Sequence, residues 1–326
     1  MISIIIPAHN SERYVRDCVV SILANDMLDT EITLVDDGST DATSAICDEL
    51  AASHSTVHVI HRENGGPAAA RNTGIESAVH GPDDWIWFVD SDDLVSKGSI
   101  DSLRAWGSIS DADALYFGLV RFRDGETADW KGSHEVKYGT LAPEEFLSGT
   151  YSGKYDHYLF RFLFRWNALE RLLARRKAEG HLHLFDEDYS LLEDLVFVEE
   201  FMHGPCHSIQ TGSHVLYGYR QVATSMVREI SSKAADSALR AVRHIDNFSV
   251  SKTDEPHKQR MQIRLLFNAY RAAGTGDETR GLRCKIRGEI IRRAKETGVC
   301  QLSRPLLLRY FALRTGLGDL FLKYRG

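Results

Sequence analysis

The sequence has few cysteines, few prolines and no long hydrophobic run. Its 5 cysteines include no Cys-x-x-Cys pair, which argues against a zinc ribbon or a disulfide framework and favours a reducing compartment. With 7 prolines and 26% charged residues, the composition excludes collagen-like, coiled-coil and wholly disordered chains. The N-terminal run ISIIIPA is short and lacks a basic flank, so we expect neither a signal peptide nor a membrane span, and we expect a cytoplasmic protein.

Charge is distributed unevenly along the chain, whose net charge is −7. Residues 282–326 hold 11 Lys and Arg against 3 Asp and Glu, whereas residues 1–281 hold 28 against 43. A basic tail on an acidic body predicts that the tail meets something anionic. An anionic membrane surface and the acidic body of the same chain both fit this prediction. Nothing in the pattern indicates a nucleic-acid partner.

The tail also has an apolar stripe at helical spacing with basic residues at its flanks. The stripe consists of Leu306, Tyr310, Leu313, Leu317, Leu320 and Tyr324, and the flanking residues are Arg309, Arg314, Lys323 and Arg325. This pattern is typical of a helix on an anionic membrane, which would place the protein at the inner face of the membrane. A core helix packed on the rest of the chain gives the same stripe, so both interpretations stay open.

Apolar strands alternate with amphipathic helices over the first 120 residues. The expected strands are ISIIIPA, EITLVDDGS, VHVIHR and DWIWFVDSDD. This alternation predicts an α/β fold with a mostly parallel, doubly wound sheet flanked by helices. Further along, ALYFGLVRF predicts a strand, HSIQTGSHVLYGYR a pair of short strands, and SLLEDLVFVEEFMHG a helix. We expect an α/β domain at 1–225 and a basic helical region at 226–326.

Polar clusters follow three of these strands, at 7–10, 36–39 and 90–93. Ligands of parallel sheets bind outside the carboxyl ends of the strands, so these clusters mark a candidate site. Three carboxylates at 90–93 repel one another unless a cation such as Mg²⁺ or Mn²⁺ compensates their charge. An acidic turn that caps the next helix is the alternative.

Two more features belong to the candidate site. Asp37 is a candidate ligand for a base or ribose edge, and Asp41 has the simpler task of helix capping. Gly65 and Gly66 permit close approach of a ligand to the backbone before a helix whose N-terminus favours phosphate, and Arg71 adds positive charge. A plain loop before a helix explains the glycines equally well.

Four motifs together carry a family resemblance: SIIIPAHNSERYV, ITLVDDGSTDAT, ENGGPAAARNTGI and WIWFVDSDDLV. Their order and spacing resemble those of family 2 glycosyltransferases of GT-A fold, of the type that builds bacterial surface polysaccharides. The resemblance implies inverting transfer from a nucleotide-diphosphate sugar, for which we expect a UDP-sugar. It implies that the sugar is transferred to a hydroxyl of a glycan or lipid-linked acceptor, and that Mn²⁺ or Mg²⁺ is the cofactor.

The resemblance also assigns residues within the donor site. It implies that Ala8 and His9 line the nucleotide base, that Asp37 contacts uracil and that Arg220 and Arg228 contact the diphosphate. It implies that Asp90 contacts ribose or metal and that Asp92 is the metal ligand, with Ser91 between them. A further metal ligand in some GT-A enzymes is a histidine, for which His207 and His214 are candidates.

The acceptor side of the resemblance rests on Glu193-Asp194-Leu195-Val196-Phe197. It implies that Asp194 is the general base, and a positioned carboxylate can take the proton of an attacking hydroxyl. The aromatic segment 151–166 is a candidate for stacking on the acceptor sugar.

Other functions of similar folds fit less well. A dinucleotide-dependent dehydrogenase needs Gly-x-Gly-x-x-Gly after a strand, and the sequence contains none. A nucleotidyltransferase usually has a glycine-rich loop after the first strand, where this chain has PAHNSERY. A non-catalytic nucleotide-sugar-binding paralogue, or a scaffold of a polysaccharide assembly complex, is the remaining alternative.

Overall fold

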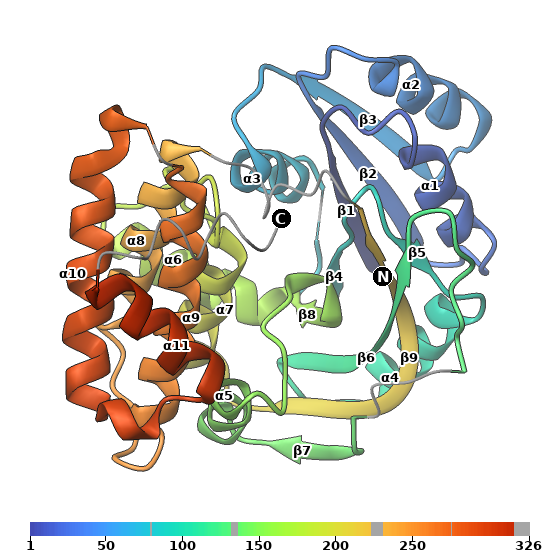
Figure 1. Cartoon of the computed structure of the whole chain (residues 1–326). Helices are drawn as coiled ribbons and strands as arrows, with labels where there is room; N and C mark the ends of the chain where they lie inside the picture. The colour runs from blue at the N-terminus through green and yellow to red at the C-terminus, as the bar shows by residue number, and fades with distance from the viewer. Residues whose placement is uncertain (79, 132–135, 223–230, 275, 316–326) are drawn as a thin grey trace. The chain divides into compact units, whose positions relative to one another are not determined.

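Figure 1 shows the chain as a computed structural model, which describes residues 1–78, 80–131, 136–222, 231–274 and 276–315. The chain divides into two compact units. The sheet unit contains Met1–Phe146, His157–Glu187 and Glu200–Ala223, and the helical unit contains Leu147–Asp156, Asp188–Glu199 and Thr224–Gly326. The chain crosses from the sheet unit to the helical unit for the last time between residues 223 and 224, close to the boundary expected at 225. Two earlier segments, 147–156 and 188–199, also belong to the helical unit.

The strands all belong to the sheet unit. They are β1 (Ile2–Ala8), β2 (Thr30–Asp37), β3 (Val57–Arg62), β4 (Trp85–Phe88), β5 (Leu94–Val95), β6 (Ala114–Arg123), β7 (Gly139–Leu141), β8 (Phe162–Arg165) and β9 (Ile209–Gln221). The helices of this unit are α1 (Val15–Leu23), α2 (Thr43–Ser53), α3 (Pro67–Ser77), α4 (Ser99–Ile109) and α6 (Trp166–Ala178). Helices α5 (Pro143–Ser152) and α7 (Glu193–His203) each run from one unit into the other.

The strands form one mixed sheet in the order β3-β2-β1-β4-β8-β6-β9-β5, with β7 paired to β9. The ladders from β3 to β4 are parallel, and β8 pairs antiparallel with both β4 and β6. The α/β class with helices flanking the sheet is therefore confirmed. The expectation of two short strands within HSIQTGSHVLYGYR was wrong, because β9 is one 13-residue strand. It pairs with β6 along its length, with β7 at its start and with β5 near its end.

Strand β1 lies at the centre of the parallel half and is buried on both faces, as its unbroken apolar run predicts. Successive side chains point to opposite faces of the sheet, so Ile4 and Ile6 join a core with residues of α1, α2 and α4. Ile5 points to the other face, against α3. There α3 lies so close that a Cβ on Gly74 would be 2.4 Å from Cγ2 of Ile5.

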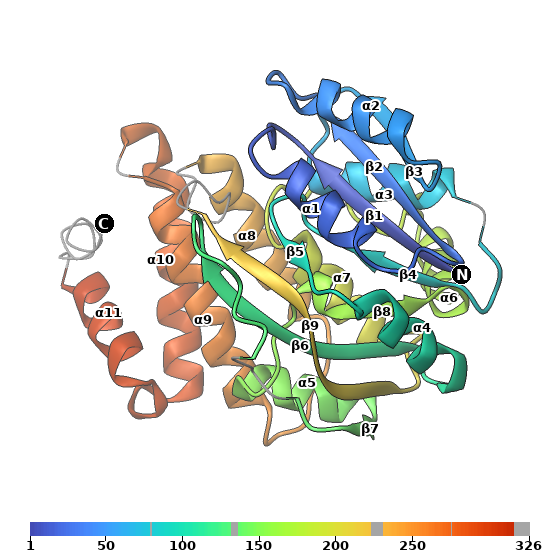
Figure 2. The same cartoon turned by 90° about the vertical axis from the view of Figure 1, so that its right-hand side faces the viewer.

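The helical unit consists mainly of α8 (Ser232–Ile245), α9 (Glu255–Ala272), α10 (Arg280–Thr297) and α11 (Arg304–Arg314). Helices α9 and α10 run side by side, and α11 packs on α10 (Figures 1 and 2). Arg293 is fully buried in this bundle, where Nη1 and Nη2 donate to both carboxylate oxygens of Asp246. No described helix has the length and the apolar character that crossing a membrane requires.

The close approach of α3 to β1 predicts that Gly74→Ala is destabilising. The added methyl group must displace Ile5 in a packed interior, which costs about 1–3 kcal/mol. Chemical denaturation followed by circular dichroism measures the change. Gly288→Ala is the matched control, because Gly288 is also helical but has open space where its Cβ would be. An equal or larger loss of stability in the control would contradict the packing argument.

Candidate functional site

The parallel register brings the polar clusters of the sequence to one edge of the sheet. Ala8 at the end of β1 pairs with Asp36 on β2, and Asp37 pairs with Arg62 at the end of β3. The Val89 N–H, just after β4, donates to the carbonyl of Ile5 on β1. The three strand ends therefore form one polar edge.

Asp37 is almost fully buried, and its carboxylate is the centre of this edge. The Gly65 and Gly66 N–H groups donate to it at 2.9 and 2.7 Å, and the Arg62 guanidinium also donates to it. The Asp37 carbonyl contacts Nδ1 of His9 at 2.8 Å. The Gly65 and Gly66 N–H groups, which we expected to face a ligand, therefore hold the Asp37 carboxylate in place. Gly66 has a φ of 90°, a positive value that glycine adopts easily.

Asp36 has a different task from its neighbour. It accepts from the Ser39 N–H at 3.1 Å and from the Ser44 hydroxyl at 2.5 Å, and it contacts His61 Nδ1 at 2.9 Å. Burial acts to raise the pKa of Asp36, but these hydrogen bonds outweigh it and lower the pKa to about 2. Asp36 therefore fastens β3 and α2 to the end of β2.

Among the carboxylates after β4, Asp90 and Asp92 differ in their partners. Arg71 Nη2 donates to Asp90 Oδ1 at 3.1 Å. No other described residue donates a hydrogen bond to the carboxylate of Asp92. Burial, together with the charge of Asp90, raises the pKa of Asp92 to about 6. Of these two acids, Asp92 is thus the one whose charge the protein compensates less.

Asp93 is fully buried and acts as an anchor. The Tyr217 hydroxyl donates to Oδ2 of Asp93 at 2.7 Å and accepts the Asp90 N–H at 3.1 Å. The Arg220 N–H donates to Oδ1 of Asp93 at 2.6 Å. Burial and the charges of Asp92 and Asp90 raise the pKa of Asp93. These bonds fix the acidic loop to β9, an anchoring role for Asp93 and Tyr217 that nothing in the sequence indicates.

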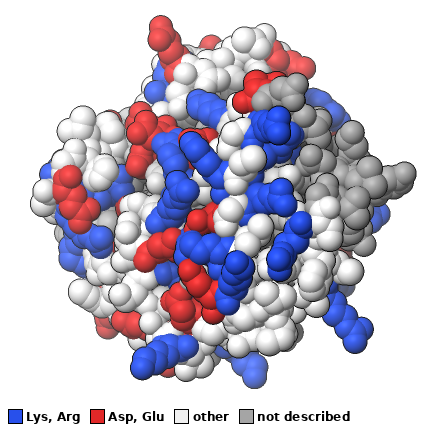
Figure 3. All heavy atoms as spheres, turned by 60° about the vertical axis from the view of Figure 1, so that its left-hand side comes forward, with Lys and Arg blue, Asp and Glu red and all other residues white. Residues whose placement is uncertain are grey.

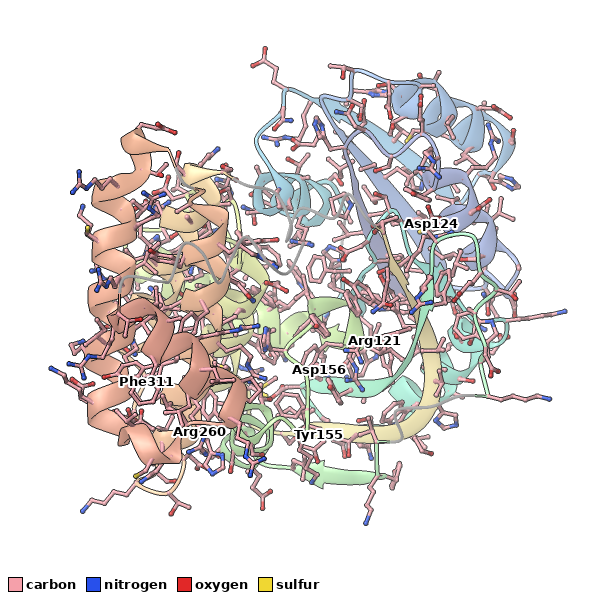
Figure 4. All side chains as sticks on the ribbon, viewed as in Figure 1. Arg121, Asp124, Tyr155, Asp156, Arg260 and Phe311 are labelled. Atoms are coloured by element: carbon pink, nitrogen blue, oxygen red, sulfur yellow. The ribbon has the colours of Figure 1, made fainter. Side chains whose placement is uncertain are left out.

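The Arg220 side chain supports the same loop. Its Nε donates to the carbonyl of Asp92 at 2.7 Å, and its Nη1 lies 3.6 Å from Asp124 (labelled in Figure 4). The guanidinium carbon lies 5.1 Å from the ring centre of Tyr14 and 5.0 Å from that of Phe122. These contacts give Arg220 a positioning role, and its contact with a diphosphate stays a prediction. Arg228 lies outside the described residues.

The remaining predicted residues are distributed as follows. Ala8 is buried, whereas His9 is exposed and its ring contacts the amide of Asn64. The Ser91 hydroxyl is buried in a 2.9 Å bond with the hydroxyl of Ser11. The Thr43 N–H donates to Asp41 Oδ1 at 2.9 Å, in agreement with a local structural role for that carboxylate.

The candidate histidine ligands lie elsewhere on β9 and before it. The His207 N–H donates to Asp113 ahead of the first residue of β9, and the His214 ring packs near Trp106. Among the described residues no group of three or more His, Cys, Asp or Glu is arranged to hold a metal. The assignment of Asp90 and Asp92 as ligands of a cation stays a prediction.

Two carboxylates fit the way Mg²⁺ and Mn²⁺ usually bind nucleotide enzymes. Such ions commonly take one or two carboxylates and complete their coordination with substrate phosphates and water. Burial and the negative charge of Asp90 both disfavour the ionised form of Asp92 and so raise its pKa. A bound cation would favour the ionised form again. The donor set is thus suited to a hard cation held jointly with a diphosphate.

Asp194 belongs to the helical unit, in the first turn of α7. The path into this turn is held by Ser237 of α8, whose buried hydroxyl donates to the Leu191 carbonyl at 2.8 Å. The same hydroxyl accepts the N–H groups of Ser190 and Leu191, each at 3.1 Å. Leu192 has a φ of 66°, a conformation that is uncommon for such a residue. The sequence analysis missed Ser237, because a serine within a helix gives no signal of a distant partner.

With this geometry in place, comparison with known proteins identifies the family. Residues 3–173, more than half of the chain, match the family described as Glycosyl transferase family 2. The chain belongs to glycosyltransferase family 2. The glycosyltransferase EpsJ of Bacillus subtilis is 31% identical over 60% of this chain and 54% of its own length. The putative glycosyltransferase EpsH of the same organism is 30% identical over 73% and 66%. The chain thus spans between half and two thirds of these relatives.

Solved structures support the fold of this family 2 glycosyltransferase. Residues 1–349 of S. aureus TarS, in complex with UDP-GlcNAc, align with a TM-score of 0.66 at 20% identity, over 98% of this chain and 89% of that chain. The mannosyltransferase PcManGT of Pyrobaculum calidifontis, in complex with GDP-Man and Mn²⁺, aligns with a TM-score of 0.55 at 15% identity, over 98% and 86%. At these identities the likeness concerns the fold, and the predicted GT-A fold is confirmed.

The contacts of His61 predict a pH-dependent contribution to stability. The hydrogen bonds to Asp36 and then to Asp48 raise the pKa of His61 above its ordinary value. The contribution is therefore fully present below about pH 6.5 and is lost as pH rises through the higher pKa of the folded state. Because the His61 side chain is 45% exposed, we expect less than about 1 kcal/mol.

Denaturant unfolding of the wild type and His61→Gln between about pH 5 and pH 9 tests this prediction. The stability difference between the two proteins should shrink as pH rises. His58→Gln is the matched control, since His58 is exposed on the same strand and is 3.9 Å from Glu31. A difference that stays constant with pH, or that grows, would contradict the charged pair.

Proposed function

We propose that the chain is an inverting glycosyltransferase that moves a sugar from a UDP-sugar to a hydroxyl of a glycan or lipid-linked acceptor. The observation that carries the proposal is the set of carboxylates at the sheet edge. Asp37 is held rigidly at the end of β2, and Asp92 is left with uncompensated charge after β4. This set suits a nucleotide at one end and a diphosphate with its cation at the other.

Each donor-site residue has a role in the proposal. In the proposal Ala8, His9 and Asp37 face the base, while Gly65, whose N–H holds the Asp37 carboxylate, and Arg71, which donates to Asp90, line the site next to them. Asp90, Ser91 and Asp92 form the side of the site nearest the diphosphate. Asp92, with Asp90, would hold Mn²⁺ or Mg²⁺, which neutralises charge on the departing diphosphate.

Asp194 is the proposed general base. The acceptor oxygen attacks the anomeric carbon, its proton passes to the Asp194 carboxylate, and the bond from that carbon to the diphosphate oxygen breaks. The nucleoside diphosphate leaves with the bonding electron pair. A single in-line displacement inverts the anomeric centre, so an α-linked donor gives a β-linked product.

The relatives favour a role in surface polysaccharide synthesis, which we expect to take place in the cytoplasm. The minor teichoic acid biosynthesis protein GgaA of Bacillus subtilis is 28% identical over 62% of this chain and 43% of its own length. TarS has been crystallised with UDP and with UDP-GlcNAc, which favours a uridine donor here. The half-buried Tyr158 ring of the segment 151–166 stacks on Phe160 at 5.2 Å and is a candidate for acceptor contact.

Nucleotide binding is the first prediction of this proposal. UDP, GDP, CDP and dTDP are compared by thermal shift, each with and without Mn²⁺. We expect UDP to stabilise the protein, by about 2.7 kcal/mol at a concentration of 100 Kd, and only when the cation is present. Asp92→Asn should abolish the cation-dependent part of the shift. Asp83→Asn, at an exposed acid of the same unit, is the control and should leave it unchanged.

The outcomes of this experiment separate the two candidate functions. Stabilisation without transfer or donor hydrolysis, under conditions in which the wild type is folded, would favour a non-catalytic nucleotide-sugar-binding protein. No shift with any nucleoside diphosphate would contradict the donor site altogether and favour a scaffold.

The second prediction concerns the base. Asp194→Asn removes the proton acceptor but keeps the shape of the side chain, so kcat should fall about 10²- to 10⁴-fold while the nucleotide shift stays as in the wild type. Turnover is measured as UDP released from the donor, with acceptor or with water alone. Asp188→Asn, an acid of the same segment, is the matched control. A larger loss in Asp188→Asn than in Asp194→Asn would overturn the assignment.

A further inference from the structure

Helix α11 is apolar on two sides. Leu306, Tyr310 and Leu313 form the stripe that the sequence predicted, and all three are buried in the core of the helical unit with residues of α9 and α10. This part of the stripe therefore packs inside the unit and cannot face a membrane. Leu317, Leu320 and Tyr324, the rest of the predicted stripe, lie outside the described residues.

The opposite side of α11 presents large apolar side chains to solvent. Leu308 is 62% exposed and Phe311, labelled in Figure 4, is 50% exposed. Residues three apart lie on one face of a helix, so the two side chains are neighbours. Both belong to the few large hydrophobic residues that are exposed in the described chain, and α11 is the helix that carries two of them.

The charged residues of helix α11 itself are all positive. Arg304 lies on the same face and Arg314 at its border by helical position, whereas Arg309 lies nearer the buried stripe. Helix α11 has no Asp or Glu, and within the described residues no carboxylate forms an ion pair with these three arginines. The Arg309 and Arg314 guanidinium carbons each lie 6.0 Å from an aromatic ring centre, of Phe267 and Tyr310. Figure 3, which brings the side of the C-terminal helices forward, shows Lys and Arg gathered there with fewer Asp and Glu among them.

We propose that this outer face of α11, made of Arg304, Leu308 and Phe311 with Arg314 at its border, docks on an anionic lipid bilayer. Leu308 and Phe311 insert at the boundary between headgroups and acyl chains. The arginines pair with lipid phosphates, with their apolar stems lying along the helix. This arrangement is that of a helix lying in the plane of the interface.

Charge argues for lipid over a second protein chain. Two copies of this face related by a twofold axis would bring arginines of like charge together without any acid between them. Two exposed apolar side chains also provide little of the roughly 1,200 Å² that a stable protein interface buries. A bilayer supplies many phosphates at once, and each basic residue near an anionic surface strengthens binding about fivefold.

The experiment is co-sedimentation of the full chain with vesicles, which is independent of the proposed sugar transfer. We expect binding to vesicles of phosphatidylcholine mixed with phosphatidylglycerol at low ionic strength. We expect weak binding to phosphatidylcholine alone, and loss of binding as salt rises. Leu308→Ser with Phe311→Ser should weaken binding about tenfold, and Arg304→Gln with Arg314→Gln about 25-fold.

Matched variants outside the face keep the test specific. Ile109→Ser and Leu182→Ser change side chains that are 80% and 74% exposed in the sheet unit, and they should bind vesicles as the wild type does. Lys97→Gln is the corresponding control for charge. Circular dichroism melting and the nucleotide shift confirm that each variant is folded, so a failure of the donor site is read separately from a failure of docking.

Three results would overturn the proposal. One is the absence of wild-type binding to anionic vesicles at low salt. Another is equal binding by the wild type and by Leu308→Ser with Phe311→Ser. The third is a dimer in solution that these serine substitutions convert to a monomer without any change in vesicle binding, which would make the face an interface between copies of the chain.

Discussion

The buried carboxylate of Asp93 is the constraint on which the proposed donor site depends. Three acids in four residues repel one another, and this loop is stable because each acid meets a different environment. The Asp93 carboxylate accepts hydrogen bonds from the Tyr217 hydroxyl and the Arg220 N–H, and the Asp90 carboxylate accepts one from Arg71. These bonds hold the Asp93 and Asp90 carboxyl groups in place, whereas no other described residue donates a hydrogen bond to the Asp92 carboxylate, which we propose is left for a ligand.

The position of Tyr217 shows how far this support extends into the core. Its ring stacks on Phe160 with the ring centres 4.4 Å apart and nearly parallel, so the hydroxyl is held in one place. The same hydroxyl bridges the Asp90 N–H and the Asp93 carboxylate. A change in the packing behind β9 would therefore shift the acidic loop that carries Asp90 and Asp92.

The sequence predicted the parallel half of the sheet well, because local information decides it. An unbroken β-branched run such as Ile4-Ile5-Ile6 forms a strand buried on both faces, and a polar cluster after such a strand must lie at the edge of the sheet. The other half of the sheet was harder to predict. The single strand β9 contains polar residues and two glycines, and its length depends on three partner strands that are distant in the chain. The roles of Asp93 and Ser237 were missed for the same reason, since each depends on a partner more than 40 residues away.

Helix α11 shows how a periodic pattern can be recognised and still leave its meaning open. The stripe of Leu306, Tyr310 and Leu313 has the spacing of one helical face, and burial in a core or insertion in a bilayer produces the same spacing. The opposite side of the helix distinguishes burial in a core from insertion in a bilayer. There Leu308 and Phe311 occupy positions that a core-packed helix normally fills with polar residues. A helix that has already buried one apolar stripe gains nothing in its own fold from a second. The exposed pair between arginines is therefore better explained by a surface outside the chain than by the packing within it.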